Sequence, residues 1–162
     1  IVFDETTLPR KDEVVAFVVP SDGSRRVLLL WSVSWSQWFV PSRSINYGTF
    51  EARLEQELRE RVGLEPSDYR AMPMTDAGAL RLIQFSRRDL RMKHYGFRPF
   101  KVTVTLDVAD ALAKRPTAHW VEFSADGTIH HSPSPLSATL QAAPFKAALR
   151  SLVGASETAA KD

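Results

Sequence analysis

The chain has 162 residues, 44% hydrophobic and 25% charged, a composition that allows one folded domain with a buried core and excludes a disordered protein. Its net charge of +2 is too small to indicate a nucleic-acid-binding protein by itself, and the absence of cysteine excludes disulfides, thiolate metal sites and cysteine nucleophiles. No apolar run approaches the roughly 18 residues of a membrane span, and the first residues lack the pattern of a signal sequence. We therefore expect a cytoplasmic protein without a membrane partner.

The first part of the chain predicts two strands followed by a loop. Residues 12–20 (DEVVAFVVP) form a nearly continuous β-branched and aromatic run, and residues 27–33 alternate apolar and other side chains with a period of two. Turn residues at 21–24 (SDGS) separate the two runs, so the pattern predicts a β-hairpin. Periodicity is then lost over residues 36–47, which predicts a loop.

A helix with well-marked ends is predicted over residues 49–62. Its apolar side chains recur at a spacing of four and form one stripe: Phe50, Leu54, Leu58 and Val62. Thr49 is suited to the N-cap, and Gly63 is suited to the left-handed position that ends a helix. Pro66 prevents continuation of the helix.

The second half of the chain predicts further strands, a basic segment and a terminal helix. Strands are expected at residues 79–86, 100–108 and 119–124. The basic segment 87–101 is expected to be a charged loop between the first two of these strands, and a nucleic-acid contact there is the weaker interpretation. A helix is expected over residues 134–153, with Ser134 as N-cap, Pro135 at N1 and a break or kink at Pro144. The sequence thus predicts one α+β domain, residues 1–153, followed by a flexible tail, residues 154–162.

The order of these elements and the stretch QELRERVGL at residues 56–64 resemble the Nudix hydrolase family. The family's box reads G-x5-E-x7-R-E-U-x-E-E-x-G-U, where U is a bulky aliphatic residue. In this register Glu57, Leu58 and Glu60 match the box, as do the closing Gly63 and Leu64. The resemblance implies a mixed β-sheet sandwiched by helices.

Four positions depart from the family's pattern, so the box is degenerate. Ser42 stands in place of the first glycine, Gly48 in place of the upstream glutamate, Gln56 in place of the arginine, and Arg61 in place of a glutamate. The departures leave enzymatic activity open.

The resemblance also implies a chemistry. Box glutamates of this family bind Mg²⁺ or Mn²⁺ and cleave a pyrophosphate bond in a nucleoside diphosphate linked to another group. Glu57 and Glu60 are therefore the candidate catalytic and metal residues, and at 100° per residue they lie about 60° apart on the helix, so both can face one ion. Arg53 and Arg61 lie four residues before and after Glu57, within reach of its carboxylate, and should weaken the binding of a dication.

The arginines can instead serve a ligand. Arg43, Arg53 or Arg61 could bind a phosphate group directly, because a guanidinium matches phosphate in a bidentate manner. Trp35 and Trp38 lie just before the helix and could stack on a nucleobase. Ordinary Glu–Arg pairs on a solvated helix face and core packing of the tryptophans are the alternative interpretations.

Three functions remain open from the sequence. The leading hypothesis is recognition of a nucleotide or another phosphorylated ligand, with pyrophosphohydrolase activity lost or reduced and no cofactor needed. The second is an active Mg²⁺- or Mn²⁺-dependent pyrophosphohydrolase with a modified metal site. The third is a non-catalytic module that binds a protein or nucleic acid, which leaves a protein partner open. Because the sequence starts at Ile1 without a methionine, a processed product or a domain of a longer parent chain is open as well.

Overall fold

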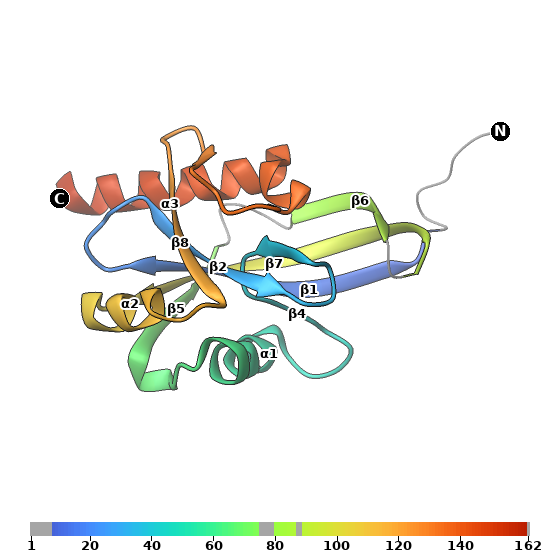
Figure 1. Cartoon of the computed structure of the whole chain (residues 1–162), viewed down its shortest axis with the longest axis horizontal. Helices are drawn as coiled ribbons and strands as arrows, with labels where there is room; N and C mark the ends of the chain where they lie inside the picture. The colour runs from blue at the N-terminus through green and yellow to red at the C-terminus, as the bar shows by residue number, and fades with distance from the viewer. Residues whose placement is uncertain (1–7, 75–79, 87–88, 162) are drawn as a thin grey trace.

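The computed structural model describes residues 8–74, 80–86 and 89–161, and for residues 85 and 153–161 it describes the backbone only. Within these ranges two β-sheets lie between helices, with α3 (Ala143–Lys161) on one side and α1 (Phe50–Glu57) and α2 (Leu106–Ala113) on the other (Figure 1). The α+β fold class with helices on both sides of the sheets is thus confirmed. No helix in the described ranges is long and apolar enough to cross a membrane.

The larger sheet is mixed and is built around two long strands. β1 (Arg10–Pro20) runs parallel to β7 (Arg91–Val104) and antiparallel to β4 (Ser42–Ser44). Two further strands, β5 (Tyr69–Pro73) and β6 (Leu80–Ser86), pair antiparallel with β7. The smaller sheet has the order β3 (Gln37–Phe39), β2 (Arg26–Ser32), β8 (Ala118–Phe123) and β9 (Ile129–His130).

From Val14 onward strand β1 is buried on both faces, which explains its continuous apolar run. Val15 and Phe17 belong to a core cluster that includes residues of α3, and the Phe17 ring lies 6.1 Å from the Phe145 ring. Val14 and Ala16 belong to a second cluster that includes residues of α1 and α2. The sheets therefore separate two cores, one under each helical layer.

The predicted helix at residues 49–62 is confirmed, with one change in its second half. The Thr49 side chain accepts a hydrogen bond from the Ala52 N–H at 3.1 Å, and Gly63 ends the helix at φ 83°. Residues Leu58–Val62, however, form a π-helical segment after the α-helical turns. Such a widened turn is frequent at functional sites. A short 3₁₀ helix (Pro66–Asp68) follows.

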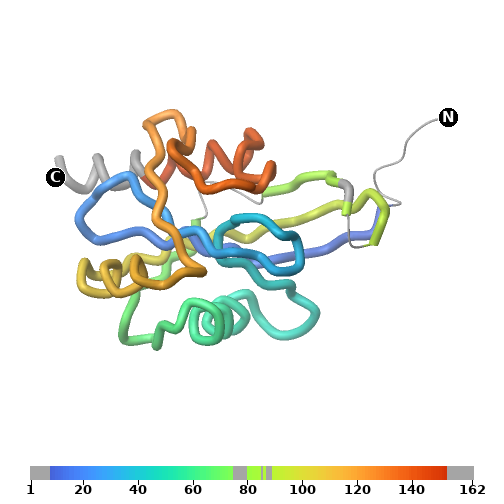
Figure 2. The backbone as a smooth tube through the Cα atoms, in the orientation of Figure 1, coloured from blue at the N-terminus to red at the C-terminus, as the bar shows by residue number. Residues whose placement is uncertain are grey.

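The predicted β-hairpin at the start of the chain is wrong. β1 and β2 lie in different sheets. β1 pairs with β4 and β7, and β2 pairs with β8 and with β3, which lies inside the loop predicted at 36–47. The chain passes from β1 to β2 through a wide loop (Figure 2). An apolar pattern on both faces does not indicate which strand lies at either edge, so the turn residues at 21–24 are not sufficient to predict a hairpin.

Two other boundaries differ from the sequence prediction. The predicted strand 100–108 ends at Val104, because the Thr105 side chain caps α2 by accepting a hydrogen bond from the Val108 N–H at 3.4 Å. The basic segment 87–101 is not a loop over most of its length, since β7 begins at Arg91. Its charged residues therefore flank buried positions of a central strand. Residues 75–79, where the strand predicted at 79–86 starts, and residues 87–88 lie outside the described ranges.

The terminal helix begins later than predicted. Residue Leu136 forms a bridge with Trp38, a 3₁₀ helix covers Ala138–Gln141, and α3 starts only at Ala143. Pro144 thus lies in the first turn, where backbone N–H groups have no acceptor within the helix. The lack of an N–H at Pro144 therefore does not break the helix. The backbone of α3 continues through residues 154–161; the flexibility of this end stays a prediction.

Candidate functional site

Glu57 lies at the centre of an ion-pair cluster that joins α1 to β4. Its side chain is only 1% exposed. Its Oε1 atom accepts a hydrogen bond from Arg43 Nε at 3.2 Å, and its Oε2 atom accepts from Arg61 Nη1 at 3.0 Å and from the Ser42 N–H at 3.1 Å. Burial raises the pKa of the Glu57 carboxyl, and the guanidiniums of Arg61 and Arg43 oppose that rise. Both carboxylate oxygens are thus engaged by cationic side chains.

Glu60 lies on the outer side of the same cluster. Its side chain is 53% exposed, and Oε2 lies 2.9 Å from Arg43 Nη2. The Gln56 amide donates to its Oε1 at 3.1 Å, and this hydrogen bond, followed by the effect of Arg43, lowers the pKa of Glu60. Arg43 therefore lies between the two glutamates that the sequence predicts as metal ligands.

Arg53 does not contact Glu57, contrary to the expectation from its spacing of four residues. Its Nε donates to the Ser44 carbonyl at 3.0 Å, and its Nη1 donates to Gln56 Oε1 at 2.6 Å. Its guanidinium lies over the Tyr47 ring, 5.2 Å from the ring centroid. The side chain thus ties the loop before α1 to the helix.

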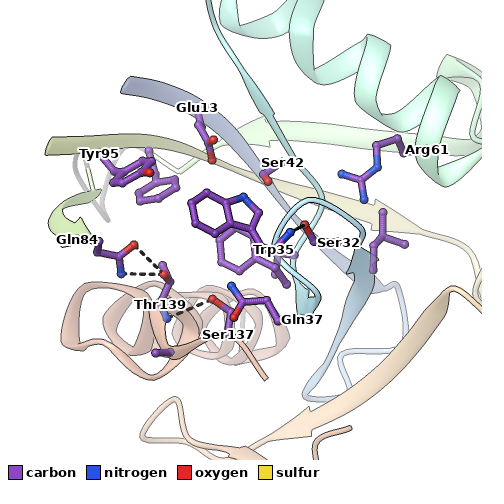
Figure 3. Close-up of a pocket in the computed structure, with 15 residues that line it drawn as sticks. Glu13, Ser32, Trp35, Gln37, Ser42, Arg61, Gln84, Tyr95, Ser137 and Thr139 are labelled. Atoms are coloured by element: carbon purple, nitrogen blue, oxygen red, sulfur yellow. Dashed lines mark hydrogen bonds between the residues drawn. The ribbon is translucent and has the colours of Figure 1, made fainter. Parts of the chain in front are cut away.

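Next to the cluster lies a cavity of about 340 Å³. Arg61 lies at one end of it, Tyr95 and Gln84 lie at the other, and the Trp35 indole lies between them (Figure 3). The lining side chains are mixed, with aromatic, hydroxyl, amide and charged groups: Glu13, Leu30, Ser32, Trp35, Gln37, Phe39, Val40, Ser42, Arg61, Gln84, Tyr95, Phe97, Ser137, Ala138 and Thr139. The cavity therefore offers both an aromatic surface and polar groups to a small molecule.

The two predicted tryptophans have different positions relative to this cavity. Trp35 lines it. Trp38 is paired with Trp31 across β2 and β3, with the two rings edge to face at 5.6 Å, and it also lies 5.9 Å from the His119 ring. Trp38 is absent from the cavity wall and packs between strands. Trp35, by contrast, is available to a ligand.

Sequence comparisons identify no relatives: no protein-family model and no curated protein matches the chain. Solved structures do match. A MutT/Nudix family protein from Listeria innocua has a TM-score of 0.60 at 15% identity, with 91% of this chain and 96% of that chain covered. This likeness decides the fold. The chain has a Nudix fold.

Two further structures agree with this assignment. An Ap4A hydrolase from C. elegans has a TM-score of 0.51 at 14% identity, covering 94% of this chain and 98% of that chain. A MutT protein from Methanosarcina mazei Go1 has a TM-score of 0.50 at 17% identity, covering 96% and 99%. The similarity inferred from the box and the element order is therefore confirmed at the level of the fold.

Within this Nudix fold, the box residues as arranged do not fit a magnesium or manganese ion. Such an ion needs several oxygen ligands in near-octahedral geometry. Both oxygens of Glu57 already face guanidiniums, and Glu60 is paired with Arg43. In the described ranges there is also no group of three or more acidic or histidine side chains that could hold a metal ion.

Sequence reasoning missed the residues at the inner end of the cavity. Glu13 is a largely buried carboxyl on β1, and burial raises its pKa while Lys11 opposes the rise. Tyr95 belongs to the segment interpreted as basic, and its hydroxyl is buried in the cavity wall. One signal was available: Glu13 shares the strand phase of Val15 and Phe17, so a carboxyl at that position had to face the core.

Proposed function

We propose that this Nudix-fold protein binds a nucleotide or another phosphorylated small molecule in the cavity lined by Arg61 and Trp35, and that binding needs no divalent cation. The phosphate lies at the Arg61 end, and the ring lies against Trp35. The hydrolysis associated with an intact box is lost or strongly reduced.

The observation that supports this proposal most directly is the double occupation of the Glu57 carboxylate by Arg43 and Arg61. Arg53 lies next to this cluster because it donates to Gln56, which donates to Glu60, so three guanidiniums lie near the two carboxylates of Glu57 and Glu60. Unit charges about 4 Å apart interact by about 4 kcal/mol at an effective dielectric near 20, so the excess positive charge disfavours a dication and favours an anion.

Arg61 can bind a phosphate without leaving Glu57. A guanidinium has five N–H donors. Arg61 uses one on Glu57 and one on the Trp31 carbonyl, which accepts from Nη2 at 3.3 Å. Its side chain is 38% exposed, so the remaining donors are accessible. Glu57 then acts as a positioning residue that holds the guanidinium at the cavity.

Calorimetric titration of GDP in EDTA tests the proposal, with Arg61→Gln compared with Arg59→Gln. Arg59 is the matched control because it lies on the same helix, pairs with Glu55 at 2.7 Å and does not line the cavity. Loss of one charge-assisted phosphate contact, roughly 1.5–3 kcal/mol, should weaken binding about tenfold or more in Arg61→Gln. Arg59→Gln should bind within about twofold of wild type.

The hydrolase alternative makes the opposite prediction. If the box is active, GDP or a GDP conjugate is turned over in Mg²⁺ or Mn²⁺, and Glu57→Gln abolishes that turnover. Such a result would overturn the proposal. Equal GDP binding by wild type and Arg61→Gln would overturn it as well.

A further inference from the structure

The inner end of the cavity, defined by Glu13, Tyr95 and Gln84, lies away from Arg61 and has its own hydrogen-bonding groups. Figure 3 shows these three side chains turned toward the Trp35 indole. Since Arg61 accounts for a phosphate in the proposed function, this end of the cavity can select the other part of the ligand.

The Tyr95 hydroxyl is buried and has no hydrogen-bond partner among the described residues. The residue is only 4% exposed, and its ring stacks on Phe97 with an interplanar angle of 11°, which holds the hydroxyl in place. Buried hydroxyl groups are nearly always paired, because an unpaired one loses its bonds to water without replacement. Because Tyr95 lines the cavity, an acceptor atom of a bound ligand could supply the missing partner.

Glu13 presents a carboxylate to the same space. Its side chain is 12% exposed, and Lys11 Nζ lies 3.4 Å from Oε1. This ion pair is made by Oε1, and Glu13 lines the cavity. The carboxylate therefore can accept N–H donors from a ligand while Lys11 compensates its charge.

Gln84 and Thr139 form a fixed wall beside these groups. The Gln84 amide donates to Thr139 Oγ1 at 2.8 Å, and the Thr139 hydroxyl donates back to Gln84 Oε1 at 3.0 Å. The Thr139 N–H is held in turn by Ser137 Oγ at 3.3 Å. This end of the cavity is thus preorganised for a flat ligand against Trp35, where stacking contributes about 1–3 kcal/mol per base.

We propose that Glu13 and Tyr95 select an uncharged planar heterocycle whose edge carries two adjacent N–H donors beside an acceptor, as the guanine base does. The two donors of guanine, N1–H and the exocyclic amine, match the carboxylate, and its O6 accepts from the tyrosine hydroxyl. Adenine has an acceptor, N1, where the carboxylate needs a donor. The inference rests on the proposed function only for the position of the phosphate at Arg61.

Nucleosides without phosphate test the inference separately. Wild-type protein is titrated in EDTA with guanosine, inosine and adenosine. Inosine lacks only the exocyclic amine, so its binding should be about tenfold weaker than that of guanosine, the loss expected for one hydrogen bond to a charged group. Equal affinity for guanosine and adenosine would overturn the inference, and this comparison needs no variant.

Two isosteric variants assign the roles. Glu13→Gln should reduce the guanosine preference over inosine to within about twofold, whereas a preference that persists would contradict a role for the carboxylate. Tyr95→Phe should weaken the binding of guanosine and of inosine by the same factor, because both bases have O6. A loss of affinity confined to guanosine would contradict the assigned acceptor.

The result also separates this inference from the proposed function. Arg61→Gln should weaken GDP binding by a larger factor than guanosine binding. If GDP binding depends on Arg61 but shows no preference for the base, the inference fails and the proposed function stands. If the guanosine preference is present but Arg61 has no effect on GDP, the proposed function fails and the specificity of the inner cavity stands.

Discussion

Replacement of Tyr95 by phenylalanine should stabilise the ligand-free protein. The substitution removes one hydroxyl oxygen, which is buried and unpaired among the described residues, and leaves the stacked ring in place. An unsatisfied buried polar group costs roughly 1–3 kcal/mol. Only one oxygen atom is removed, so little packing is lost.

We therefore expect a net gain of about 1 kcal/mol in the free energy of unfolding, or about 2–4 °C in Tm for a chain of this size. Urea unfolding followed by tryptophan fluorescence measures it. Tyr47→Phe is the matched control because Tyr47 is 72% exposed, and its stability should change by less than about 0.5 kcal/mol. With saturating guanosine the order should reverse, because wild type gains more from ligand binding.

The opposite sign would refute this reasoning. If Tyr95→Phe destabilises the ligand-free protein by about 1 kcal/mol or more, the hydroxyl has a partner, such as a buried water, and does not wait for a ligand. The inference about the inner end of the cavity would then lose one of its two supports.

Three further predictions concern the box, the buried carboxyl and the helix end. Arg61→Glu alone should not create a Mn²⁺ site measurable by calorimetry, because Arg43 still engages the box carboxylate, whereas adding Arg43→Ala should raise Mn²⁺ affinity. Burial raises the pKa of Glu13 above 4.5, so folding favours the neutral form of its carboxyl. The free energy of unfolding should therefore fall as the pH rises from about 4.5 through that raised pKa. Glu13→Gln should flatten this fall in urea melts. Gly63→Ala should lower the free energy of unfolding by about 1–2 kcal/mol, more than Gly48→Ala does. Both glycines have positive φ, but of the two only Gly63 would place a Cβ near another atom, 3.2 Å from Arg115 Nη1.

Local signals in the sequence predicted the elements better than their partners. The helix after Thr49 was predictable because its cap, its apolar stripe and Gly63 all agree. The pairing of β1 was not, because a strand that is apolar on both faces carries no mark of its neighbour, and a short turn sequence was wrongly taken for a hairpin. The helix after Thr105 was missed because its first residues continue the apolar run of β7.

The candidate site was predictable where the residues share one helix. The spacing of Glu57 and Arg61 places both on one face, and the structure pairs them at 3.0 Å. Arg43 lies fourteen positions away from Glu57 in the sequence. Its side chain reaches the same carboxylate because the pairing of β4 with β1 places it there. Glu13 and Tyr95 line the same cavity because β1 and β7 are neighbours, a parallel pairing that no local pattern encodes.

The most direct measurement for the central claim is the affinity of wild-type protein for GDP with and without a divalent cation. Calorimetric titrations in EDTA and in millimolar Mg²⁺ or Mn²⁺ should give dissociation constants within about twofold of each other, with the GDP recovered unchanged, because guanidiniums hold the Glu57 carboxylate. Binding that appears only with the cation, or GDP that is cleaved in its presence, would contradict the account.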